Sequence, residues 1–280
     1  SPKPVTSPKP VTSPKPVTSP KPTTSAKPVT SPKPTPSQTL AAQLHTTIPA
    51  SPLNGFDTCT APSTGAMNAW RSKFSAVGIY IGGQNMACDY GNLSKSWVAQ
   101  VHKKGWSLLP IYVGLQAPCN SFHGSISAKS AGSQGKTAAD AAVADAGNFG
   151  LGKGSPIYFD MEAYNNGNSS CRTAVLTFLD AWTRELHAKG YVSGVYSSAS
   201  SGVTDLVNTS SINGHSLVEP DALWFALWDN KNNLTGTPYL PGNRWAGDRD
   251  KQYAGGHNQK VGSYTLNIDS DRVGGAVSGP

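Results

Sequence analysis

Short apolar runs alternate with amphipathic segments along most of the chain, starting near residue 53. Runs rich in β-branched and aromatic residues predict eight strands, at 53–57, 77–82, 107–114, 156–161, 191–196, 222–228, 251–254 and 264–269. Helical spacing predicts helices at 64–74, 94–104, 137–149 and 171–189, and a short one near 202–208. The clearest is 171–189, where Val175, Leu179, Trp182 and Leu186 share one face and Gly190 follows as a stop.

This alternation favours a parallel sheet wrapped by helices, which is an α/β fold. Eight strands within about 230 residues predict a modified (β/α)8 barrel of the TIM type over residues 53–280, irregular in its last third. An open, doubly wound sheet is the structural alternative.

The first 36 residues have a different pattern. They are six tandem six-residue units, beginning with three copies of SPKPVT, and they hold twelve of the 22 prolines and six of the 23 Lys and Arg residues. Proline at this density forbids helix and favours extended polyproline II geometry. We therefore expect a disordered stalk or linker at 1–40 and a polar connector at 41–52.

The repeats also change how the net charge is interpreted. The whole chain carries +7 and the repeats carry +6, which leaves +1 for the remainder. The basic pI thus belongs mainly to the repeats, and no aromatic residue lies among their lysines to stack on bases. We expect no nucleic-acid partner. No apolar run is long enough to predict a membrane span, and a monomer is expected.

Four cysteines, Cys59, Cys88, Cys119 and Cys171, each follow a predicted strand. No CxxC occurs and the six histidines are scattered, so neither a metal site nor a cofactor is expected. An even count beside a Pro-rich stalk favours two disulfides in an oxidising compartment, and four free thiols in a cytosolic protein are the alternative. Of three possible pairings, Cys59–Cys88 and Cys119–Cys171 join neighbouring loops on one rim of a barrel and are favoured.

Carboxylates at strand ends are the main candidate chemistry. Asp57 closes the first predicted strand, Asp160 and Glu162 close the fourth, and Asp269 and Asp271 close the eighth. The rim at the carboxyl ends of barrel strands is where active sites lie. Crowded carboxyls there raise one another's pKa, which suits an acid paired with an ionised carboxylate, as glycoside hydrolysis requires. A single Asp in such a place is equally explained as a helix cap.

Aromatic residues supply the second half of a sugar-binding site, because the apolar faces of sugar rings stack on them. Trp224 and Trp228 lie four residues apart on the sixth predicted strand, and Trp228, beside Asp229, is the best stacking candidate. Tyr253 and Tyr80 are further candidate contacts, although core packing also explains the strand tyrosines.

Several of these elements together resemble a known family. Gly55-Phe56-Asp57, the 79–83 run IYIGG, the 156–162 run PIYFDME, Ala226-Leu227-Trp228, Lys251-Gln252-Tyr253 and Ile268-Asp269 resemble, in order and placement, the DUF1906 glycoside-hydrolase-like domain of secreted actinobacterial proteins. That domain is similar to the GH25 muramidases. The resemblance implies a modified barrel, export and a peptidoglycan-type ligand. It also implies that Glu162 is the general acid, that Asp160 is the stabilising carboxylate, and that Asp57 and Asp269 line the same cleft.

The sequence therefore predicts a secreted or wall-associated glycoside hydrolase acting on cell-wall polysaccharide. Two alternatives stay open: a glycan-binding module without activity, and a structural protein of the cell envelope with the same barrel.

Overall fold

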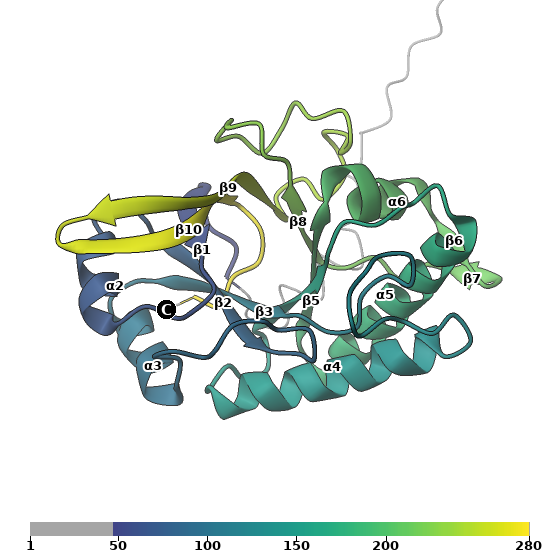
Figure 1. The fold of residues 1–280 in the computed structure, drawn as a ribbon, viewed down its shortest axis with the longest axis horizontal. Helices are drawn as coiled ribbons and strands as arrows, with labels where there is room; N and C mark the ends of the chain where they lie inside the picture. Colours follow the sequence, from purple (N-terminus) through teal and green to yellow (C-terminus); the bar gives the residue numbers. More distant parts are fainter. Residues whose placement is uncertain (1–46, 280) are drawn as a thin grey trace, which may run out of the picture. The chain divides into compact units, whose positions relative to one another are not determined.

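A computed structural model describes residues 47–279 of the chain. The predicted stalk at 1–40 and the first half of the connector, residues 41–46, lie outside these residues. The described part is a closed barrel flanked by helices (Figure 1). Its strands are β1 (Leu53–Asp57), β2 (Ala76–Gly82), β3 (Ser107–Tyr112), β4 (Pro156–Met161), β5 (Val192–Ser198), β8 (Ala222–Ala226), β9 (Arg249–Val261) and β10 (Tyr264–Val273).

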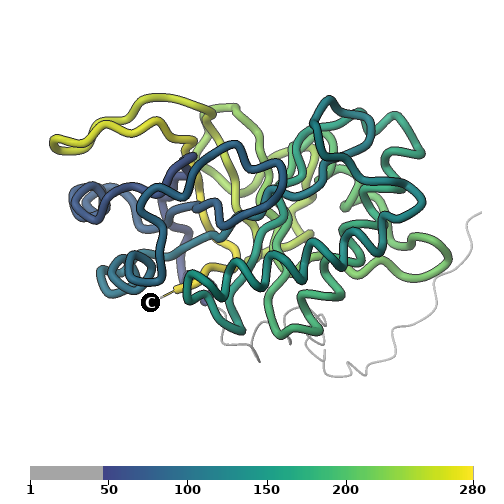
Figure 2. The backbone as a smooth tube through the Cα atoms, turned by 60° about the horizontal axis from the view of Figure 1, so that its bottom comes forward, coloured from purple at the N-terminus to yellow at the C-terminus, as the bar shows by residue number. Residues whose placement is uncertain are grey.

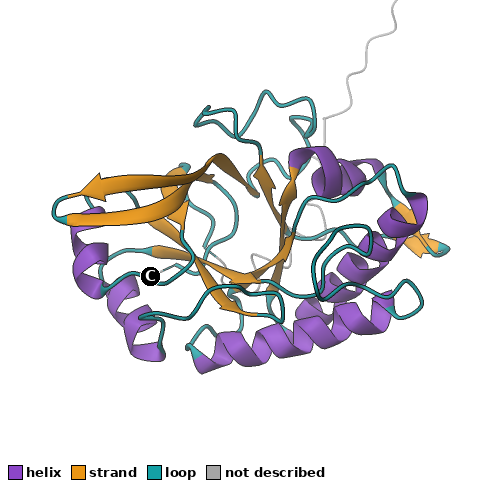
Figure 3. Ribbon diagram, in the orientation of Figure 1, coloured by secondary structure: helices purple, strands orange, loops and turns teal. Residues whose placement is uncertain are grey.

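The helices lie outside the strands, as Figure 3 shows in purple and orange. They are α2 (Thr64–Trp70), α3 (Lys95–Lys103), α4 (Ala131–Asn148), α5 (Ser169–Lys189) and α6 (Thr204–Asn208), the last preceded by a π-helical turn, η1 (Ala199–Val203). The helix α4 begins six residues earlier than the predicted 137, which shortens the loop that precedes it. Within the described residues, no helix is long and apolar enough to cross a membrane.

Side-chain caps fix where the helices begin. The oxygens of Ser63, Ser94 and Asn168 accept hydrogen bonds from the backbone N–H groups of Ala66, Trp97 and Cys171, at 3.2, 3.1 and 3.1 Å. Each bond satisfies a first-turn donor that has no partner within its helix. At the other end of α5, Gly190 adopts a left-handed conformation with φ of 81°, which glycine tolerates at a helix end.

The barrel order is β1-β10-β9-β8-β5-β4-β3-β2, and neighbouring strands are parallel except around β10. The prediction of a modified eight-stranded barrel is confirmed, but the last two strands are joined as an antiparallel hairpin. Only Gly262 and Ser263 separate β9 from β10. A two-residue connection can join only antiparallel strands, so no helix intervenes and β10 closes the barrel against the direction of β1 and β9. The hairpin tip extends past the barrel beside α2 (Figure 2).

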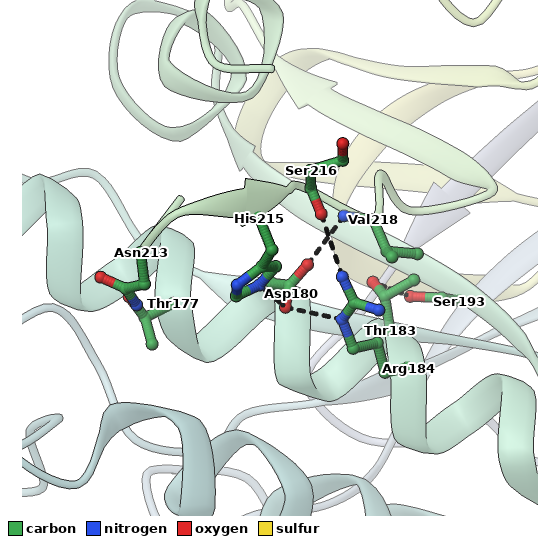
Figure 4. Close-up of polar contacts among 9 residues, drawn as sticks. All are labelled: Thr177, Asp180, Thr183, Arg184, Ser193, Asn213, His215, Ser216 and Val218. Atoms are coloured by element: carbon green, nitrogen blue, oxygen red, sulfur yellow. Dashed lines mark hydrogen bonds and ion pairs between the residues drawn. The ribbon is translucent and has the colours of Figure 1, made fainter. Parts of the chain in front are cut away.

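A second hairpin, β6 (Ser211–Ile212) and β7 (His215–Ser216), has no counterpart among the predicted elements. Figure 4 shows how it is held on α5 through buried Asp180. The carboxylate of Asp180 accepts from Arg184 Nε at 2.8 Å and Val218 N at 2.7 Å, and pairs with His215 Nε2 at 3.1 Å. Burial opposes ionisation of Asp180, but these hydrogen bonds outweigh it and lower its pKa.

The long excursion between β8 and β9, residues 227–248, is organised by two cations on β9. The Arg249 guanidinium donates to backbone carbonyls of the excursion, including that of Leu234 at 3.2 Å. Lys251 is only 1% exposed, and its ammonium binds the Asp229 carboxylate at 2.7 Å and the carbonyl of Lys231 at 2.9 Å. Trp228 is the second residue of this excursion and lies beyond the end of β8. The prediction that it lies on the strand is therefore wrong.

Both disulfides of the favoured pairing are present, Cys59–Cys88 and Cys119–Cys171. The first joins the loops after β1 and β2, and the second joins the loop after β3 to the first turn of α5. All four cysteines therefore hold the rim at the carboxyl ends of the parallel strands.

The opposite end of the barrel is covered by the C-terminal segment. Ser278 forms a bridge with Leu108 at the start of β3, and Ala276 and Val277 are buried against a small apolar cluster that includes Tyr158. Among residues 47–279, the disulfide-linked rim is thus the end of the barrel that this segment does not cover.

Candidate functional site

The carboxylates predicted at strand ends meet at the disulfide-linked rim, although not all at the same depth. Asp57 ends β1, Asp160 lies in β4, and Glu162 follows β4 directly. Asp269 pairs with Asp57 across the antiparallel ladder and lies level with it, whereas Asp271 pairs with Gly55 and lies deeper. The prediction that Asp269 and Asp271 close their strand is wrong, because β10 runs toward the opposite end and continues to Val273.

Three of the five carboxyls are nearly inaccessible: Asp57, Asp160 and Asp271 are 2%, 4% and 1% exposed. Burial is the main cause that raises their pKa values, since desolvation disfavours the charged form. The pKa of Asp57 rises to about 8, with Asp269 as the next cause. Those of Asp160 and Asp271 lie well above the usual range, because neighbouring carboxylates add to the desolvation. In the described part of the chain, Asp160 Oδ1 and Asp271 Oδ2 have no hydrogen-bond partner.

Glu162 differs from these three because it lies at the mouth of the site. It is half-buried, and burial followed by the charge of Asp269 raises its pKa, against a hydrogen bond from the backbone of Ala163 that lowers it. It lines a cavity of about 360 Å³ whose other lining residues are Ala163, Tyr196, Ser198, Ala226, Leu227 and Trp228. Glu162 is thus a carboxyl that retains a proton to higher pH than a free Glu and that can meet a ligand.

Gln116, which sequence reasoning missed, sets the backbone that carries Asp160 and Glu162. It is fully buried, and its side-chain nitrogen donates to the carbonyl of Asp160 at 2.6 Å while its oxygen accepts from the backbone N–H of Glu162 at 2.8 Å. These two bonds fix the backbone at the end of β4, between the buried Asp160 and Glu162 at the mouth of the site.

Gln252 is a second residue that sequence reasoning did not assign, although it lies in the Lys251-Gln252-Tyr253 run noted above. Its side-chain nitrogen donates to Asp57 Oδ2 at 2.8 Å and to Asp269 Oδ2 at 3.2 Å. Its oxygen accepts from the Tyr196 hydroxyl at 3.0 Å and the Trp228 indole at 2.8 Å. One amide therefore joins the carboxylates to the aromatic side of the cavity.

The four aromatic candidates lie in different parts of the site. Trp224 is 1% exposed inside the barrel, where its indole donates to Asp271 Oδ1 at 3.2 Å, whereas Trp228 is 63% exposed at the rim. Tyr80 lines a small inner pocket together with Asp57 and Asp160. Tyr253 is half-buried at the extra position of a β-bulge on β9, and its contact with a substrate stays a prediction.

Chemically, the site combines a protonatable carboxyl at the mouth, a group of buried carboxyls behind it, and an exposed indole beside them. No group of three His, Cys, Asp or Glu side chains among residues 47–279 is placed to hold a metal ion. The arrangement fits proton donation to a ligand oxygen, with a neighbouring anion facing any positive charge that develops.

Solved structures with the same fold are distant in sequence. The spore cortex lytic enzyme SleM of Clostridium perfringens matches with a TM-score of 0.52 and 13% identity, covering 79% of this chain and 67% of that one. An uncharacterised protein of B. stearothermophilus matches at 0.50 and 15%, covering 79% and 95%. The modular autolysin LytC of Streptococcus pneumoniae matches at 0.50 and 12%, covering 79% and 46%.

No curated protein sequence matches the chain. The sequence model of the Rv2525c-like, glycoside hydrolase-like domain matches residues 68–273, which include every strand from β2 to β10 and all of the site except Asp57. The barrel with its carboxylate rim and this match over most of the chain lead to one conclusion: the protein belongs to the Rv2525c-like, glycoside hydrolase-like domain family.

Proposed function

We propose that this protein is an exported glycoside hydrolase that cleaves a cell-wall polysaccharide of the peptidoglycan type, with Glu162 as its general acid. The observation that carries the proposal is Glu162 itself, a half-buried carboxyl with a raised pKa that lines an open cavity beside the exposed indole of Trp228. The choice of a cell-wall glycan follows from the fold, which is shared with an autolysin and a spore cortex lytic enzyme. Export is supported by the two disulfides.

In this mechanism, a sugar ring stacks on Trp228 and brings its glycosidic oxygen to Glu162. The Glu162 proton moves to that oxygen as the bond to the anomeric carbon breaks. The positive charge that develops on the sugar needs a facing anion. Asp160 was assigned this role by resemblance, but its burial and two neighbouring carboxylates favour its neutral form.

We assign the anion to the pair of Asp57 and Asp269 instead. One oxygen of each carboxyl accepts a hydrogen bond from Gln252. Burial raises the pKa of Asp269, while the charge of His257 and the interaction with Asp57 oppose that rise. One proton and one negative charge shared between these two carboxyls supply a fixed anion close to the mouth.

Release of reducing sugar from purified peptidoglycan tests the proposal. Glu162→Gln preserves shape and removes the proton, so we expect hydrolysis to fall by about a hundredfold or more while glycan binding is retained. Glu219→Gln is the matched control, because Glu219 pairs with Arg244 on the excursion outside the cavity. Equal rates for wild type and Glu162→Gln would exclude Glu162 as the acid.

One observation favours a second function, a glycan-binding module without turnover. The inner pocket bounded by Asp57, Asp160 and Tyr80 has a volume of only about 10 Å³, so a sugar ring does not fit against the buried carboxyls without movement of the rim. Wild-type protein that binds peptidoglycan but releases no sugar would establish this second function.

A further inference from the structure

The side-chain amide of Gln252 uses all of its hydrogen-bonding positions within the site. Its nitrogen donates to Asp57 and Asp269, and its oxygen accepts from Tyr196 and Trp228. Because an indole N–H can only donate, it defines which end of the amide faces it. The donor end of Gln252 therefore faces the carboxylates and the acceptor end faces Trp228.

Trp228 is the most exposed large apolar side chain among the described residues, yet its ring is held in place. The indole N–H is fixed by Gln252 at 2.8 Å, and the ring lies against Gly255. A Cβ atom at position 255 would lie 2.6 Å from three ring atoms, which is too close for any side chain. At the adjacent Gly256 the nearest atoms would be 3.9 Å away. An exposed ring with one polar anchor and one packed face is pre-ordered to receive a ligand.

We propose that Gln252 is a positioning residue that holds the Trp228 indole as a sugar-stacking surface at a fixed place relative to the carboxylates, and that the same amide keeps Asp57 and Asp269 supplied with hydrogen-bond donors. The identity of the ligand as a sugar rests on the function proposed above. The positioning itself rests on the four hydrogen bonds and on the contact with Gly255.

The two ends of the amide can be altered separately. Gln252→Glu retains oxygens that accept from Tyr196 and Trp228 but removes both donors to the carboxylates and adds a negative charge beside them. Gln252→Met removes both ends with little change in volume. Gly255→Ala displaces the indole and leaves the Gln252 side chain intact. Two matched controls are available: Gly256→Ala, and Gln259→Glu, which makes the same charge change farther along β9.

The first measurement is the indole N–H resonance of Trp228 in a ¹H–¹⁵N spectrum, identified as the signal lost in Trp228→Phe. We expect Gln252→Met and Gly255→Ala to move this signal toward that of a water-exposed indole. Gln252→Glu and both controls should leave it near its wild-type position. An unmoved signal in Gln252→Met and Gly255→Ala would overturn the positioning role. If Gln252→Met does not fold, Gly255→Ala decides the matter, because it removes no hydrogen-bonding group.

The second measurement separates binding from turnover, using peptidoglycan disaccharide fragments and purified peptidoglycan. We expect Gly255→Ala to raise KM and weaken fragment binding about tenfold with kcat changed little, because the stacking surface has moved. Gln252→Glu should mainly lower kcat, because the stacking surface remains while the carboxylates gain a like charge. Identical changes in KM and kcat for the two variants would overturn the division of roles. If wild type hydrolyses nothing, the proposed catalysis fails, and the indole signal with fragment binding still tests Gln252.

Discussion

Asp250 and Asp160 lie toward opposite ends of the same barrel, and both are nearly inaccessible to solvent, at 0% and 4% exposed. Asp250 accepts hydrogen bonds from the Tyr158 hydroxyl at 2.8 Å and from the backbone N–H groups of Gly274 and Gly275 at 2.9 and 2.8 Å. Asp160, by contrast, leaves one carboxyl oxygen without a partner among the described residues. Two carboxyls that are almost equally buried therefore differ in their hydrogen bonding: that of Asp250 is satisfied, and that of Asp160 is not.

The bonds of Asp250 fasten the C-terminal segment under the barrel, so this carboxyl stabilises the closed end. An unpartnered polar atom destabilises the folded state, because its lost hydration is not replaced. An unpartnered oxygen at the disulfide-linked rim, such as that of Asp160, is explained if the rim binds a ligand. Two disulfides join the loops of the rim, whereas the hydrogen bonds of Asp250 hold the closed end, and Asp160 at the rim keeps an oxygen without a partner among the described residues.

The largest expected effect concerns the two disulfides at the rim. Replacing both cysteines of either pair by serine should lower the free energy of unfolding by about 3–4 kcal/mol, because the closed loops span 29 and 52 residues. Denaturant unfolding of the two double variants measures it. Hydrogen exchange should increase at the loops after β1 to β4 and stay low at the closed end; a uniform increase would contradict the division between the two ends.

The second prediction compares the two buried carboxyls directly. Asp250→Ala leaves the buried backbone N–H of Gly275 without an acceptor and leaves that of Gly274 only the Arg249 carbonyl at 3.2 Å. It should cost about 3 kcal/mol, visible as a loss of several degrees in Tm. Asp160→Ala removes a carboxyl that is partly unsatisfied and should cost less than about 1 kcal/mol. Calorimetry of the two variants, prepared alike, measures the difference. Equal losses would show that Asp160 is as much a structural residue as Asp250.

A third prediction concerns pH, since both ends contain carboxyls with raised pKa values. Burial raises the pKa of Asp57 to about 8, of Asp250 to about 7 and of Asp248 to about 6. The pKa of an aspartate in the unfolded chain is about 4, so between that value and these folded-state pKa values the folded protein binds more protons than the unfolded chain. Stability should increase as pH falls from about 8.5 toward 5, and be lost as pH rises through the folded pKa values.

Tm measured between pH 5 and 9 tests this dependence, and two variants separate the ends. Asp57→Asn should remove the part of the slope near pH 8, and Asp250→Asn the part near pH 7. A wild-type Tm that rises from pH 5 to 8 would mean that these carboxyls are ionised in the folded protein.

The smallest expected effect concerns Gln116, which belongs to the rim but touches no ligand-facing atom. Gln116→Met removes the bonds that fix the backbone of Asp160 and Glu162, so we expect a loss of about tenfold in hydrolysis with Tm lowered by only a few degrees. Gln100→Met on the exposed face of α3 is the control. A large fall in Tm without a change in rate would make Gln116 a core residue only.

Local sequence determined much of this molecule. The strand β4 lies where its apolar run predicted it, and the caps at Ser63 and Ser94 begin their helices, because a run of buried side chains and a capping oxygen act within a few residues. The disulfide pairing also followed from sequence, since loops after consecutive parallel strands must share one rim.

Tertiary structure decided the rest. The Gly262–Ser263 pair is typical of a two-residue hairpin turn. The apolar pattern, however, predicts a short strand that ends at residue 254 and a last strand that ends at the rim, so it does not predict the depth of Asp271. Gln116 and Gln252 had no pattern to single them out. Their partners lie 44 and 46 residues away for Gln116, and as far as 195 residues away for Gln252. A lone amide becomes part of a site only when the closed barrel brings its partners within hydrogen-bonding distance, and no property of the neighbouring residues encodes that distance.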